Sequence, residues 1–282
     1  MARGTPERPE TQPNQPGFSY FGYDSAAVQK HYIASEASLV ADLFLPHLQS
    51  GMSLLDCGCG PGTITLGLAE ATAPGEVVGI DLEPSMIERA NAFARERQVA
   101  NVRFQVADIH ELPFPDSSFD AVFTSAVLEH LENPVDALKE IRRVLRPGGL
   151  VGVVSTDWSE PLISPPDESV RRFFELFEKG FKHQGGSLNR GRHLRIMLRE
   201  AGFNVTEFVA SYGNSATPEA VQTAVEGYVS WIENLPLFDR VVELGWVDHP
   251  TLERIGAGMR QWSKHPDAFL ATGKCRAVAT KE

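Results

Sequence analysis

The sequence predicts an α/β protein built on a parallel sheet. Between about residues 52 and 155, short apolar segments alternate with segments of helical periodicity, the pattern of repeated βαβ units. A glycine-rich turn follows the first apolar segment, and the second and third segments end in an acidic residue. A chain of 282 residues with 42% hydrophobic content is long enough for one large domain that carries inserts.

The N-terminal part of the chain differs from this core. The first 17 residues carry four prolines and almost no apolar side chains, so we expect a disordered tail. No apolar stretch follows its charges, which excludes the pattern of a signal peptide. Residues 18–50 are predicted to form an N-terminal helical cap, with a helix over 25–48. The apolar side of that helix would carry Val28, Tyr32, Leu39, Leu43 and Leu48.

Five apolar segments predict the buried strands of the sheet. They are residues 52–58, 76–81, 101–108, 118–126 and 150–155. The periodicity between them predicts helices over 63–73, 84–97 and 131–145. Proline stands in the first turn of the second helix, and a Pro-Gly-Gly sequence ends the third.

Two further strands and two inserts complete the chain. A helix near 191–201 leads into a sixth strand at 203–211, and residues 273–281 alternate like a seventh strand. The core is therefore expected to comprise residues 51–154, 190–210 and 273–282. The intervening segments, 155–189 and 211–272, are expected to be helical inserts, and they contain all four tryptophans.

The turn after the first strand has the sequence Asp-Cys-Gly-Cys-Gly-Pro-Gly-Thr and opens a helix. Glycines allow a tight turn and close approach of a ligand to the backbone, and the helix start supplies N–H groups. Asp81 ends the second strand, where an acid can accept hydrogen bonds from both ribose hydroxyls of a nucleoside cofactor. Asp108 ends the third strand. Acids at the carboxyl ends of parallel strands predict a nucleotide-type site there.

At this point the sequence resembles a known family. The segments LLDCGCGPGTITLGLA, VVGIDLEPSMIERA, VRFQVADIHELPFPDSSFDAVFTSAVLEHL and ALKEIRRVLRPGG look like those of class I S-adenosylmethionine-dependent methyltransferases. They are most like the branch that includes the ubiquinone and menaquinone biosynthesis enzymes and many natural-product enzymes. The resemblance covers about residues 52–155. It implies a Rossmann-like sheet of seven strands with helices on both faces, the last strand antiparallel, and S-adenosylmethionine as cofactor.

The resemblance also implies roles for individual residues. The loop that lines the methionine part of the cofactor would comprise Asp56, Gly58, Gly60, Pro61 and Gly62. Asp81 would bind the ribose hydroxyls, with Leu82 and Met86 against the adenine. Asp108 would accept a hydrogen bond from the adenine amino group, with Ile109 beside it, and Ser125 would lie near the methionine moiety.

Methyl transfer from a sulfonium is an in-line displacement that mainly requires an aligned acceptor and the exclusion of water. A general base helps when the acceptor is a hydroxyl or an acidic carbon. The candidates are Glu129 and His130, which follow the fourth strand, and His31 on the N-terminal helix. A helix cap, a packing contact and a surface histidine are the respective alternatives. Cys57 and Cys59 lack nearby partners for zinc, so no metal is expected.

The inserts suggest the kind of acceptor. In this superfamily such segments cover the substrate, and their aromatic residues favour a small hydrophobic molecule of terpenoid, prenylated, aromatic or polyketide-like type. The candidate contacts are Tyr20, Tyr23, Tyr32, Trp158, Phe177, Phe181, Trp231 and Trp246. Ordinary core packing is the alternative for these rings. C- and O-methylation are both expected possibilities, and the sequence does not choose between them and N-methylation.

The charge balance bears on partners. A formal charge of −11 argues against a large nucleic-acid footprint. No apolar run approaches the length of a membrane span, and three cysteines favour a cytoplasmic protein. The aromatic segment 18–32 suggests a homo-oligomer. The alternative hypotheses are a protein or other macromolecular methyltransferase and a non-catalytic S-adenosylmethionine-binding protein. An NAD-dependent oxidoreductase is a further alternative, but the Gly-x-Gly-x-Gly spacing of the loop differs from the Gly-x-Gly-x-x-Gly spacing of that class.

Overall fold

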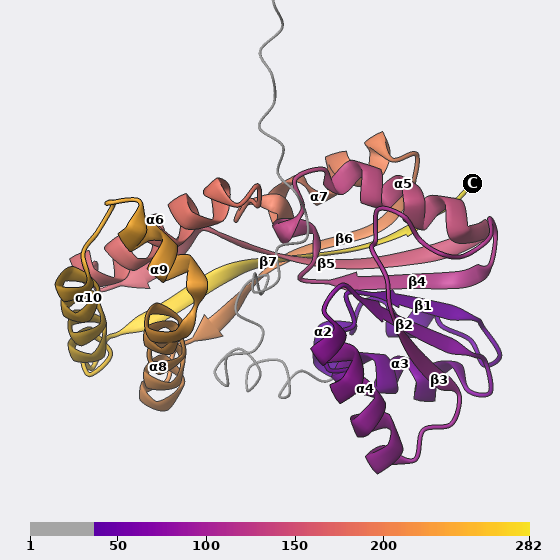
Figure 1. Ribbon diagram of the computed structural model, residues 1–282, viewed down its shortest axis with the longest axis horizontal. Helices are drawn as coiled ribbons and strands as arrows, with labels where there is room; N and C mark the ends of the chain where they lie inside the picture. Colours follow the sequence, from indigo (N-terminus) through magenta and orange to yellow (C-terminus); the bar gives the residue numbers. More distant parts are fainter. Residues whose placement is uncertain (1–36) are drawn as a thin grey trace, which may run out of the picture.

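The computed structural model describes residues 37–282 and contains one sheet of seven strands in the order β3-β2-β1-β4-β5-β7-β6 (Figure 1). The strands are β1 (Leu54–Cys57), β2 (Val77–Asp81), β3 (Val102–Val106), β4 (Phe119–Ser125), β5 (Leu145–Ser164), β6 (Asn204–Ser215) and β7 (Phe269–Thr280). The first five strands are parallel, and β7 runs antiparallel to both β5 and β6. The predicted seven-stranded sheet with an antiparallel last strand is confirmed.

Helices cover both faces of the sheet (Figure 1). One face carries α2 (Ala37–Val40), α3 (Thr63–Thr72) and α4 (Pro84–Arg97), and the other carries α5 (Pro134–Val144) and α7 (Arg190–Glu200). Two short 3-10 helices, η2 (Leu45–His47) and η3 (Leu128–His130), lie in connections. Leu138 and Leu194 anchor the buried cluster on the α5 and α7 face, and Phe44 and Leu68 anchor the cluster on the opposite face.

Four further helices form a separate lobe at one end of the sheet (Figure 1). They are α6 (Glu168–His183), α8 (Pro218–Asn234), α9 (Pro236–Glu243) and α10 (His249–Trp262). The lobe has its own hydrophobic cluster, which includes Phe173, Phe238 and Met259. It therefore packs as a second core beside that of the sheet.

The sequence predicts two helical inserts, but the structure shows that parts of both are β-strand. Residues 155–164, 211–215 and 269–272 continue β5, β6 and β7 beyond the core and carry the lobe. These extensions pair with one another, for example Ile163 with Leu270 and Asn214 with Ala271, so their backbone groups stay hydrogen-bonded. The ladder is irregular between Asp157 and Leu162, where Pro161 lacks an N–H.

The helix predicted over 25–48 is wrong in its described part. Only α2 and η2 form there, and the Leu39 side chain is 67% exposed instead of lying on a buried face. Phe44 takes the core position and stacks on Phe123 with 5.5 Å between ring centroids. A Cβ at Gly152 would lie 2.4 Å from the Phe44 ring, so the glycine makes room for it. The tail and the first half of the cap lie outside the described residues.

Candidate functional site

The predicted cofactor residues meet at the carboxyl edge of the parallel strands. Cys57 in β1 pairs with Ile80 in β2 and with Thr124 in β4, so the ends of these three strands lie side by side. The glycine loop after β1, Asp81 at the end of β2 and Ser125 at the end of β4 therefore share one edge. This edge faces the helical lobe (Figure 1).

The glycine loop needs its glycines because of its backbone conformation. Gly58, Gly60 and Gly62 have φ values of 75°, 52° and 83°, in the left-handed region that side chains disfavour. The N–H groups of Gly58 and Cys59 both donate to the carbonyl of Ile80, at 2.8 and 2.9 Å. The loop is thus held against the end of β2, and α3 begins directly after it with Gly62 as its N-cap residue.

Asp81 is tied into the same loop. Its Oδ2 accepts a hydrogen bond from the Gly60 N–H at 2.9 Å, and its Oδ1 accepts one from the Glu83 N–H at 3.0 Å. Burial is the main cause that raises the pKa of this carboxyl. Each carboxylate oxygen has a second lone pair, so Asp81 retains the capacity to accept ligand hydroxyls.

Asp56 was expected to line the cofactor, but in the structure its side chain lies beneath the loop. Its side chain is buried, and Thr65 Oγ1 donates a hydrogen bond of 2.6 Å to its Oδ2. Burial raises the pKa of Asp56 to about 7, and the nearby charge of Asp81 acts in the same direction. The hydrogen bond joins the end of β1 to the first turn of α3, so it stabilises the glycine loop that connects them. The sequence did not single out Thr65, whose i+9 spacing from Asp56 carries no recognisable signal.

The side chains expected around an adenine ring differ in exposure. Leu82 is 58% exposed at the end of β2, whereas Met86 in α4 and Ile109 are buried. Asp108 is exposed, and its Oδ1 lies 3.0 Å from His110 Nδ1 and accepts the His110 N–H at 2.8 Å. Leu82 and Asp108 therefore offer an apolar surface and an acceptor at the edge, while Met86 and Ile109 are buried and offer no exposed surface.

The candidate base Glu129 is buried instead of lying at an open edge. Its Oε2 accepts the Ser155 hydroxyl and its Oε1 the Thr156 N–H, both at 3.0 Å. Its own carbonyl accepts the Ser187 N–H at 2.7 Å. Burial is the main cause that raises the pKa of Glu129, and the charge of Arg190 opposes it. Glu129 thus joins η3 to β5 and to the connection between α6 and α7.

His130 follows in the same 3-10 helix. Its ring lies 5.2 Å from the Phe181 ring of α6, and burial lowers its pKa to about 4. The imidazole is therefore neutral near neutral pH, the form that can accept a proton. The third candidate base, His31, lies outside the described residues, and so do Tyr20, Tyr23 and Tyr32.

These side chains fit S-adenosylmethionine. Among the described residues, nothing lies within 4 Å of the position that a Cβ of Gly60 would take, so a ligand can approach the backbone there. A protein-family profile described as a methyltransferase domain matches residues 48–202, more than half of the chain. The chain belongs to this methyltransferase family. S-adenosylmethionine is the cofactor of the family.

Comparisons with known proteins agree with this assignment. The methyltransferase is 33% identical over 195 residues to the O-methyltransferase resE of Aspergillus sclerotiorum, covering 68% of this chain and 70% of that protein. It is 40% identical over 160 residues to a 37.1 kDa protein in transposon Tn4556 of Streptomyces fradiae, covering 56% of this chain and 45% of that protein. The chain thus spans about half the length of the first curated relatives it matches.

The fold has solved counterparts. The chain superposes on the YcgJ protein of Bacillus subtilis with a TM-score of 0.55 at 20% identity, covering 90% of this chain and 99% of that chain. At this identity the likeness shows the fold. No helix within residues 37–282 is long and apolar enough to cross a membrane. In the same range, no group of three or more His, Cys, Asp or Glu side chains is placed to hold a metal ion.

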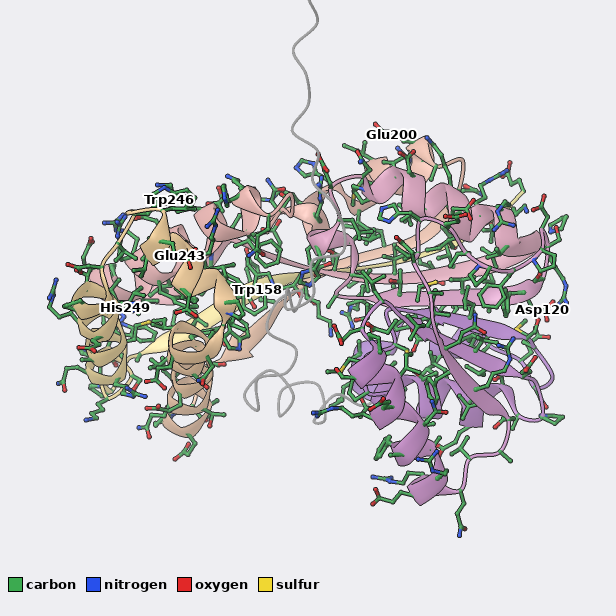
Figure 2. The ribbon with its side chains drawn as sticks, in the orientation of Figure 1. Asp120, Trp158, Glu200, Glu243, Trp246 and His249 are labelled. Atoms are coloured by element: carbon green, nitrogen blue, oxygen red, sulfur yellow. The ribbon has the colours of Figure 1, made fainter. Side chains whose placement is uncertain are left out.

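The lobe separates the predicted acceptor residues into three groups. Phe177 and Phe181 are buried inside the lobe, so they are core residues. Trp158 and Trp231 are only partly buried, with 5.7 Å between their rings. Trp246 lies apart from both. Figure 2 shows Trp158 on the side of the lobe that faces the core and Trp246 on the outer side.

Trp246 and its surroundings form a different surface. Lys179 lies over the Trp246 ring, with its ammonium nitrogen 3.9 Å from the ring centroid. Trp246 also lines a cavity of about 540 Å³ together with Arg172 and Asp248. The structure thus does not bring Trp246 together with Trp158 and Trp231. Tyr228, which the sequence analysis missed, packs against both of those tryptophans at 6.1 and 5.3 Å. Its i, i+3 spacing from Trp231 was the available signal.

Proposed function

We propose that this methyltransferase transfers a methyl group from S-adenosylmethionine to a small hydrophobic acceptor held between the carboxyl edge of the sheet and the lobe. The main support for this proposal is the position of the Trp158 and Trp231 side chains. Both rings stay partly exposed at the edge of an otherwise buried aromatic cluster, and Trp158 faces the core (Figure 2). Apolar rings left accessible beside a cofactor site are typical of pockets for hydrophobic ligands.

Bound S-adenosylmethionine supplies an activated methyl group on a sulfonium. The chain's part is to bind and orient. The glycine loop brings its backbone to the cofactor, and Asp81 accepts hydrogen bonds from its hydroxyls. Trp158 and Trp231 would hold the acceptor and exclude water from the reacting atoms.

The chain also offers a group that can take a proton. His130 is neutral near neutral pH, while the burial that lowers its pKa to about 4 makes it a weaker base than a free imidazole. In O-methylation it would accept the proton of the acceptor hydroxyl, while Glu129 holds η3 in place through β5. The relationship to the O-methyltransferase resE favours O-methylation over C-methylation.

The test is a product assay with purified protein, S-adenosylmethionine and a panel of terpenoid, phenolic and polyketide acceptors, read by mass spectrometry. Methylated product from a hydrophobic member is expected, with a rate that changes little between low and high salt. A macromolecular acceptor would instead depend on charge and ionic strength. Rates that collapse with salt, or transfer only to proteins, would overturn the proposal.

A further inference from the structure

Lys274 lies in the segment of β7 between the core and the lobe. Its neighbours in the strand show on which face of the sheet its side chain lies. Side chains alternate between the two faces along a strand. Cys275 belongs to the buried cluster on the face covered by α5 and α7. Arg276 forms an ion pair with Asp42 and donates to Ser211 Oγ at 3.2 Å, on the opposite face. Lys274 therefore shares the face of Arg276.

The register places Lys274 relative to the cofactor edge. Ser125 at the end of β4 pairs with Val154 in β5, which pairs with Arg276 in β7. Lys274 lies two residues beyond Arg276, in the part of the strand that leads to the lobe. With strands about 4.8 Å apart and a rise of about 3.3 Å per residue, its Cα lies roughly 12 Å from that of Ser125. An acceptor between the cofactor edge and the lobe would meet this strand.

The surroundings of Lys274 suit an anion. It pairs with Thr156 in β5 and with Ser211 in β6, so hydroxyl side chains flank it on the same face. Lys274 is half-buried, and within residues 37–282 its ammonium makes no ion pair or side-chain hydrogen bond. Asp42, the acid whose charge acts on Lys274, already pairs with Arg276. A partly desolvated ammonium beside hydroxyls binds an anionic oxygen favourably.

We infer that Lys274 is a specificity-determining residue that binds an anionic oxygen, of a carboxylate or a phosphate, on the hydrophobic acceptor. The inference rests on the proposed function, because it requires the acceptor to lie between the cofactor edge and the lobe. It adds a charged end to that acceptor. A cation at this position favours an anionic acceptor over a neutral analogue.

The experiment uses three probes of similar shape, naphthoate, naphthyl phosphate and the neutral naphthamide. Each is titrated by calorimetry into the protein saturated with S-adenosylhomocysteine. We expect at least one of the anions to bind wild type about tenfold more tightly than naphthamide, the size of one charge-assisted hydrogen bond. Lys274→Met should abolish that preference, and Lys274→Arg should retain most of it. The anion with the larger loss identifies the group.

Lys264→Met is the matched control, because it removes one positive charge from the exposed turn that follows α10. It should leave the preference unchanged. If wild type shows no preference for either anion, or if Lys274→Met keeps it, the inference is overturned while the proposed function stands. The Trp158→Ala variant distinguishes a failure of the proposed function from a failure of the inference about Lys274. Unchanged binding of all three probes in that variant would overturn the proposed function itself.

Discussion

The main-chain N–H of Gly60 donates a hydrogen bond of 2.9 Å to Oδ2 of Asp81, so the acid at the end of β2 is part of the glycine loop that follows β1. Asp81 was expected only to contact the cofactor, but it also stabilises the conformation of the glycine loop. In the proposed function, one carboxylate would therefore couple the conformation of the loop to the binding of the cofactor.

Asp81→Ala should weaken S-adenosylmethionine binding roughly ten- to a hundredfold, because charge-assisted hydrogen bonds to the ligand and to Gly60 are lost together. Calorimetric titration measures this. Asp120→Asn is the control, since Asp120 lies at the opposite end of the sheet and accepts the Ser53 N–H at 2.8 Å (Figure 2). That variant should lose stability and keep its cofactor affinity. An unchanged dissociation constant in Asp81→Ala would remove Asp81 from the site.

Asp56 predicts a pH dependence of stability. Its pKa is about 7 in the folded chain and about 3.9 in an unfolded one, so the folded state holds the proton more tightly. Stability from this group is therefore greatest below about pH 4 and falls as the pH rises through about 7. Asp56→Asn keeps an acceptor for Thr65 and removes the fall. The variant should be closest to wild type near about pH 4, and its advantage in urea unfolding should grow up to about pH 7 and stay constant above that.

The charge of Asp56 is not among the causes that shift the pKa of Glu129 or His130, so the difference between the two curves reports on Asp56 and on Asp81, whose charge acts on it. The exposed Asp267→Asn variant controls for the loss of one negative charge and should run parallel to wild type. If Asp56→Asn also ran parallel, the buried carboxyl would not be the source of the dependence.

Gly58 and Gly60 should respond differently to alanine. Both have positive φ, which costs a side chain about 1–2 kcal/mol. A Cβ at Gly58 would also lie 2.2 Å from Val127 Cγ2, whereas no described atom lies within 4 Å of a Cβ at Gly60. Gly58→Ala should therefore cost roughly 1–3 kcal/mol more than Gly60→Ala in urea unfolding. Adding Val127→Ala should recover part of that difference, and no recovery would show that the clash is not its cause.

Trp231 and Trp246 form a matched pair for the acceptor, because both are partly buried on the lobe but lie on different sides. Trp231→Ala should lower kcat/KM at least about tenfold for a hydrophobic acceptor, since burying an aromatic ring contributes roughly 25 cal/mol per Å². Trp246→Ala should stay within about twofold of wild type. Steady-state kinetics with the best acceptor of the panel measures both, and equal losses would show that the lobe aromatics act only as core.

The chain's local signals determined the sheet and the cofactor edge. Alternating strand and helix periodicity, the Gly-x-Gly-x-Gly turn and the acids after β2 and β3 are short-range patterns, and parallel strands necessarily bring them to one edge. The prediction of α4 over residues 84–97 matched to the residue, because Pro84 and its flanking residues mark its start.

Only the tertiary structure decided which aromatic rings remain accessible and what surrounds the acids. Trp231 and Trp246 look alike in sequence, yet one packs against Trp158 on the core side and the other stacks under Lys179 on the outer side. Glu129 reads as an open base, but β5 buries it through Ser155 and Thr156. These outcomes depend on contacts between segments far apart in the chain, such as the long extensions of β5 and β7, and local periodicity contains no information about such contacts.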